Sequence, residues 1–155
     1  MPQALFETHL DVQDLEQSIG FYRDVVGLDL AYEDPTGQVA FFWIGGRGRS
    51  MLGLWSAGSS PNLMRLHTAF RTELGDVLAA PARLRTLGVE PLDFHGHATT
   101  EPSVICWMPA ASVFFRDPDG HLLEFLAMLP DRPRPALRIV PYSKWVTVVQ
   151  EANDA

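Results

Sequence analysis

The chain has 155 residues, of which 46% are hydrophobic and 20% charged, as in a globular protein of one domain or of two small modules that share a core. Its formal net charge of −7 argues against a nucleic-acid-binding function, because there is no basic surplus to neutralise phosphates. A single cysteine, Cys106, cannot form an intrachain disulfide. No apolar run approaches the roughly 20 residues of a membrane helix, and the N-terminus lacks a signal-peptide pattern. We therefore expect a cytoplasmic protein without a membrane partner.

The first strand is predicted over residues 4–12, where apolar and polar side chains alternate. One face is apolar and should pack under a helix. The other face carries Glu7, His9 and Asp11, which is unusual for a core and typical of a cavity.

A helix over residues 14–26 follows. Asp14 is a favourable N-cap and Gln17 stands at the capping-box position, while Gly27 ends the helix. The spacing predicts a buried stripe of Leu15, Ile19, Tyr22 and Val26. Three strands are predicted next, over residues 28–34, 38–45 and 50–56.

The pattern then restarts with a strand over residues 64–72, in which Arg65 and Arg71 share a face with His67. A helix should run from Asp76 as N-cap to Leu87, with Pro81 as a defect that removes one helical hydrogen bond. Strands are predicted over residues 89–95, 103–109, 111–117 and 121–128.

The chain therefore reads as two copies of one pattern, residues 1–56 and 63–128, joined by a linker at 56–62. On this reading His9 and His67 are equivalent, 58 positions apart (67 − 9). Residues 129–155 form a Pro-rich extension, expected to be irregular before a short helix over 143–150. Ser143 is its expected N-cap, and Trp145 should pack on the body or on a partner subunit.

Glu124 is the one polar residue in an otherwise apolar strand that follows the turn "DPDG". A buried carboxylate without a partner costs several kcal/mol, so it should be paired or bound to a cation. His9 and His67, which both lie at cavity-facing strand positions, are the candidate partners of Glu124. Two histidines and one carboxylate form a recognised divalent-metal set that leaves positions open for water or substrate.

The segments "THLDVQDLEQSIGFYRDVVGL", "LHTAFRT" and "FRDPDGHLLEF" resemble the vicinal oxygen chelate superfamily. That group includes glyoxalase I, fosfomycin-resistance enzymes, extradiol dioxygenases, methylmalonyl-CoA epimerase and bleomycin-resistance proteins. The resemblance implies an α+β fold of paired βαβββ modules, whose curved mixed sheet forms a half-barrel around a metal cavity. It also implies that His9, His67 and Glu124 are the metal ligands. The metal could be Zn, Fe, Mn, Ni or Co.

The sequence departs from the subfamilies in informative ways. Many members take a fourth ligand from the last strand of the first module, where "SMLGLWS" offers none, which weakens a glyoxalase I assignment. The potassium-binding loop of the fosfomycin thiol transferases has no counterpart. Extradiol dioxygenases have longer chains with acid–base His and Tyr groups, and the three tyrosines here are not well placed.

For several of these residues a purely structural role is an alternative to a functional one. Asp11 and Glu7 are candidate general bases, but Asp11 can simply begin a loop and Glu7 can be a surface residue. Arg at a strand end usually reaches solvent, although Arg65 or Arg71 could bind an anionic substrate. His121 is expected to be exposed after its turn. Two more histidines, His95 and His97, are read as loop polarity rather than a second metal site, and Cys106 as a small buried residue.

Two functions are compatible with these features. The first is a metal-dependent enzyme that holds two oxygens of a small substrate and stabilises developing negative charge, with lyase, isomerase, transferase or dioxygenase chemistry left open. The second is an antibiotic-sequestering protein of the bleomycin-resistance type, without catalysis. In either case we expect a homodimer with two equivalent sites, in which His9 of one subunit joins His67 and Glu124 of the other.

Overall fold

The computed structural model describes residues 4–56 and 65–153. Its elements run in the order β1 (Glu7–Val12), α1 (Leu15–Phe21), a π-helix η1 (Tyr22–Val26), β2 (Asp29–Glu33), β3 (Val39–Ile44), β4 (Ser50–Ser56), β5 (His67–Arg71), α2 (Leu74–Thr86), β6 (Ser103–Ile105), β7 (Ala110–Arg116), β8 (Leu122–Met128), a 3-10 helix η2 (Pro135–Leu137), β9 (Ile139–Pro141) and α3 (Tyr142–Asn153). The predicted α+β class is confirmed, with two mixed sheets. Among the described residues no helix is both long and apolar enough to cross a bilayer.

The chain divides into two compact units. The first comprises Met1–Leu66 with Asp117–His121, and the second comprises His67–Arg116 with Leu122–Ala155. Most of the predicted linker at 56–62, and Met64 at the start of the predicted strand 64–72, lie outside the described residues.

The first unit is a four-stranded sheet in the order β1-β4-β3-β2, in which only the β1–β4 pair is parallel. Helix α1 begins as predicted, since the Asp14 side chain accepts a hydrogen bond from the Gln17 backbone N–H at 2.9 Å. Its last turns widen into the π-helix, which ends at Gly27 with φ 84°. The predicted stripe is confirmed, because all four of its residues are buried.

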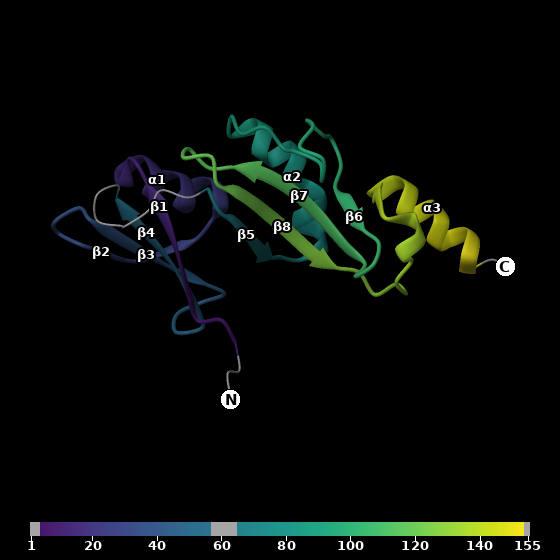
Figure 1. Ribbon diagram of the computed structural model, residues 1–155, viewed down its shortest axis with the longest axis horizontal. Coiled ribbons are helices and arrows are strands. Elements are labelled where there is room, and N and C mark those ends of the chain that lie inside the picture. Colours follow the sequence, from purple (N-terminus) through teal and green to yellow (C-terminus); the bar gives the residue numbers. More distant parts are fainter. Residues whose placement is uncertain (1–3, 57–64, 154–155) are drawn as a thin grey trace. The chain divides into compact units, whose positions relative to one another are not determined.

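The second unit is a five-stranded sheet in the order β5-β8-β7-β6-β9, with α2 across β7 and β8 (Figure 1). Arg83 of α2 lies over the ring of Phe125, 5.6 Å from its centroid. Because neighbouring strand residues point to opposite faces, Glu124 lies on the face away from α2. Cys106 is buried, as predicted.

Two predictions about the second unit are wrong. Helix α2 begins at Leu74 with Glu73 as N-cap, because Asp76 lies inside the first turn. The helix includes Pro81 and ends at Thr86, with Leu87 as its C-cap. Residues 89–95 form no strand, only isolated bridges at Leu92.

The C-terminal extension is more regular than expected. Strand β9 pairs antiparallel with β6, and α3 lies next to both (Figure 1). Ser143 is not an N-cap, since α3 begins one residue earlier and the Ser143 backbone N–H and hydroxyl both donate to Glu101. Trp145 is 1% exposed, and its indole N–H donates to Asp131 at 3.0 Å. The extension therefore packs on its own chain.

The turn between β7 and β8 belongs to the first unit. Gly120 adopts φ 85°, and one carboxylate oxygen of Asp117 accepts the backbone N–H groups of Asp119 and His121 at 3.1 and 2.8 Å. The Tyr22 hydroxyl donates to the other oxygen at 2.9 Å. Burial raises the pKa of Asp117, and burial with the adjacent Asp117 raises the pKa of Tyr22, so the phenol stays a hydrogen-bond donor.

His121 was expected to be exposed, and this prediction is wrong: the side chain is 2% exposed. Its Nδ1 accepts the Leu66 backbone N–H at 3.1 Å, and its Nε2 lies 2.7 Å from the Asp11 carbonyl oxygen. These partners require a neutral ring with its proton on Nε2. The histidine is buried because the turn folds against β1 and uses both ring nitrogens.

We expect His121→Ala to lower the free energy of unfolding by about 2–4 kcal/mol, because it leaves a buried carbonyl and a backbone N–H unpaired and opens a cavity. Urea denaturation should show this loss. His95→Ala is the control, since that histidine is exposed and its removal should change stability by less than about 0.5 kcal/mol. Equal effects of both variants would contradict this account.

Candidate metal centre and its surroundings

The second unit brings His67 and Glu124 together. Strands β5 and β8 run parallel, with Ala69 opposite Glu124, and the His67 Nε2 lies 3.1 Å from the Glu124 Oε2. The Glu124 side chain is 6% exposed, whereas that of His67 is 49% exposed. The carboxylate is thus buried beside an imidazole that solvent can reach.

Glu124 has an unpaired atom: its Oε1 is buried and has no hydrogen-bond partner among the described residues. A buried carboxylate oxygen without a partner costs free energy, so this pair fits a cation. Metal bonds of about 2.0–2.1 Å place neighbouring ligand atoms roughly 3–3.3 Å apart. The observed 3.1 Å is compatible with two ligands of one metal ion.

His9 lies in the first unit within its own set of contacts. Its Nε2 is 2.7 Å from the Glu7 Oε1, and the indole N–H of Trp55 donates to its Nδ1. The edge of Phe41 faces the ring, with centroids 6.0 Å apart. Gly53 lies opposite in β4, where a Cβ would come within 3.0 Å of the His9 Nδ1.

The predicted metal set is thus divided between the units, with His9 in the first and the other two residues in the second. Within the described part of either unit, no group of three or more His, Cys, Asp or Glu side chains is placed to hold a metal ion. The set of His9, His67 and Glu124 stays a prediction.

The other candidate residues lie in different surroundings. Asp11, a predicted base, is half-buried on β1, and its carbonyl oxygen accepts the hydrogen bond from His121. Arg71 is exposed on the same face of β5 as His67. Arg65 instead packs on the turn, since its guanidinium lies against the position of a Gly120 Cβ.

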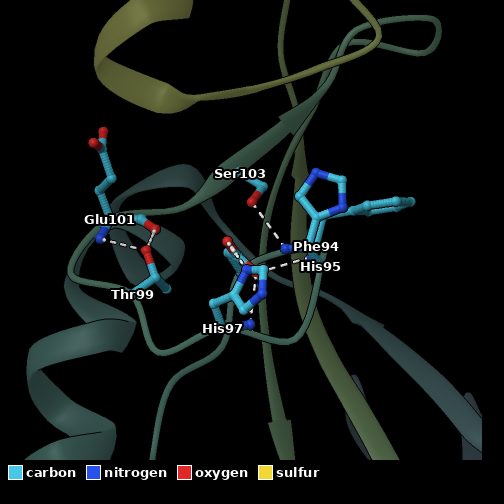
Figure 2. Close-up of polar contacts among 7 residues, drawn as sticks. Phe94, His95, His97, Thr99, Glu101 and Ser103 are labelled. Carbon is cyan, nitrogen blue, oxygen red and sulfur yellow. Dashed lines mark hydrogen bonds and ion pairs between the residues drawn. The ribbon is translucent and has the colours of Figure 1, made fainter.

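Residues 93–102 form a loop between α2 and β6 in which side chains bond to nearby backbone groups. Asp93 Oδ1 accepts the backbone N–H groups of both His95 and His97. The Ser103 hydroxyl accepts the backbone N–H of Phe94 (Figure 2). This agrees with reading the two histidines as loop polarity.

Sequence reasoning missed Gly53 and Trp55. The glycine inside a predicted strand was the available signal, because glycine there often marks a close approach of another group. Nothing in the local pattern indicated that the indole N–H of Trp55 faces a histidine.

The comparisons agree with this architecture. Residues 5–125 match the model of the Glyoxalase/Bleomycin resistance protein/Dioxygenase superfamily, and the chain belongs to this superfamily. An integron cassette protein from the mobile metagenome of Halifax Harbour Sewage Outfall is 31% identical, covers 82% of this chain and 100% of its own, and has a TM-score of 0.69.

Two further structures are similar. Lactoylglutathione lyase from Agrobacterium tumefaciens is 27% identical over 81% of this chain and 94% of its own, with a TM-score of 0.63. The fosfomycin resistance protein FosX from Listeria monocytogenes, in complex with Mn(II) and sulfate, is 24% identical over 84% of this chain and 94% of its own, with a TM-score of 0.59. At this level of identity, the similarity to FosX shows a shared fold and nothing about function.

We expect Glu124→Gln to stabilise the metal-free protein by about 1 kcal/mol or more, because the variant removes a buried charge with an unpaired oxygen. Urea denaturation in the presence of a chelator measures the change. Glu101→Gln is the matched control: both Glu101 oxygens are bonded to Ser143, so this variant should be destabilised. A loss of stability in Glu124→Gln under these conditions would argue against an unsatisfied carboxylate.

Proposed function

We propose that the protein is a metal-dependent enzyme of the glyoxalase/dioxygenase superfamily that acts on a small molecule through two of its oxygens. The observation that carries the proposal is the Glu124 carboxylate, buried with one oxygen unpaired and the other next to His67. The Mn(II) in the FosX structure adds support for a divalent metal.

The proposed metal ligands are His67 and Glu124, completed from β1, where the sequence points to His9. A divalent ion bound there would supply a Lewis acid that stabilises negative charge on substrate oxygens. Asp11, which has no hydrogen-bond partner for its side chain among the described residues, is a candidate to accept a proton. The exposed guanidinium of Arg71, on the same face as His67, suits an anionic group of the substrate.

Purified protein should contain a divalent metal, and elemental analysis should show it lost from His67→Ala and Glu124→Ala. Full metal content in both variants would overturn the proposal. His95→Ala is the control and should retain the metal, because that histidine lies in the separate loop of residues 93–102.

The second candidate is an antibiotic-binding protein without catalysis. It is favoured by the aromatic side chains around His9, because Phe41 and Trp55 both lie against its imidazole ring. Stoichiometric ligand binding that a chelator does not alter, with no turnover, would support it over the enzyme.

We also propose a homodimer with two equivalent sites, because neither unit alone brings three donors together within its described residues. In the arrangement we favour, the β1 residues of one subunit complete the His67–Glu124 pair of the other.

Mixing His9→Ala chains, which should bind metal weakly, with Glu124→Ala chains, which should bind none, tests this arrangement. One intact centre per mixed dimer should return, measured as bound metal. Subunit exchange without any recovery would show that each chain builds its own site.

A further inference from the structure

The two nitrogens of His9 are both engaged. An indole N–H can only donate, so the contact with Trp55 makes His9 Nδ1 an acceptor. The proton of the neutral ring is then on Nε2, 2.7 Å from the Glu7 Oε1, a length typical of a charge-assisted hydrogen bond (about 2.7–2.9 Å). In this arrangement neither nitrogen has a lone pair left for a metal.

The imidazole ring of His9 is also held in place by the packing around it. Phe41 meets it edge-on, and Gly53 leaves the space that it fills, since an added Cβ would lie 3.0 Å from Nδ1 and 3.1 Å from Cε1. The backbone of Gly53 is not in the left-handed region. Its lack of a side chain is therefore explained by the close approach of the His9 ring.

The first strands of the two units indicate which residue replaces His9 as a ligand. Strand β1 begins with Glu7 and β5 with His67, and each is followed by a threonine. Three positions after each first residue comes a buried apolar side chain, Leu10 in β1 and Phe70 in β5. By this register Glu7, not His9, corresponds to His67.

The strands that pair with β1 and β5, which are β4 and β8, differ at the corresponding positions. His9 corresponds to Ala69 in this register. Ala69 stands opposite Glu124, whereas His9 stands opposite Gly53. Each unit therefore presents one carboxylate next to one imidazole, but their positions on the two strands are interchanged.

We propose that Glu7 is the metal ligand contributed by β1, and that His9 is a positioning residue that holds the Glu7 carboxylate by donating from Nε2. This inference rests on the proposed metal-dependent function and changes one of its ligands. The Glu7 Oε2 has no hydrogen-bond partner among the described residues and is available to a cation. Carboxylates that bind metals are commonly oriented by such second hydrogen bonds.

The Co(II)-loaded protein distinguishes the two roles of His9. Proton NMR of a Co(II) centre shows one strongly shifted exchangeable N–H signal for each coordinated imidazole. We expect one such signal, lost in His67→Ala and retained in His9→Gln. Two signals, one of which disappears in His9→Gln, would overturn the proposal while leaving the proposed metal-dependent function in place.

Affinities for Co(II), measured by competition with a chelator, provide a second readout. His9→Ala should weaken binding by about 10–100-fold, the usual effect of losing a residue that orients a ligand, and Glu7→Gln by more than about 100-fold. His9→Gln should recover most of the affinity, because its amide can donate from the place of Nε2.

Equal losses in His9→Ala and His9→Gln, with wild-type affinity in Glu7→Gln, would reject Glu7 as the ligand. Absence of Co(II) binding by the wild-type protein would instead overturn the proposed function, and this inference with it.

Discussion

The buried polar turn at Asp117–His121 fixes the strand register on which the candidate site depends. Asp117 accepts two backbone N–H groups within the turn, and Gly120 supplies its positive φ. The turn sets how β7 pairs with β8, and thereby places Glu124 opposite Phe114. A slip of one residue would send Glu124 to the face under α2 and bring Phe125 out of the core.

The buried Glu124 carboxylate lowers the stability of the second unit. Glu124 stands opposite Phe114 on the sheet face away from α2, and both residues are buried, so an apolar residue in place of Glu124 would be buried there without an unpaired polar atom. A buried group with an unpaired oxygen is therefore hard to explain by folding alone. Cation binding supplies a physical reason for it that also agrees with the superfamily.

Much of the fold could be predicted from local patterns. The Asp14 cap, the apolar stripe of α1 and the turn before β8 follow from side-chain chemistry within a few residues. Glu124 stood out because a single carboxylate interrupted an apolar alternation. These signals are local, so they were readable from the sequence.

The errors concern contacts between distant parts of the chain. His121 is buried because it meets Asp11 and Leu66, and no local pattern reports such partners. Strand β9 forms because the edge of β6 was open for pairing, which composition could not show in a Pro-rich segment. The pairing of His9 with His67, made by residue type, stays a prediction, and the buried positions along β1 and β5 support the alternative pairing of Glu7 with His67.

The two carboxylate–imidazole pairs use the same groups in different environments. Glu124 is 6% exposed and Glu7 34% exposed, while their histidines are similarly accessible at 49% and 41%. Burial strengthens electrostatic interactions and penalises an unpaired charge, so the Glu124 pair should hold a cation more strongly than the Glu7 pair. Because Glu7 is partly exposed, water can replace a hydrogen bond that its carboxylate loses. A change in the conformation of Glu7 therefore costs less free energy than one of Glu124. In the proposed metal site, that difference would suit Glu124 to anchoring the ion and the β1 pair to adjusting around a substrate.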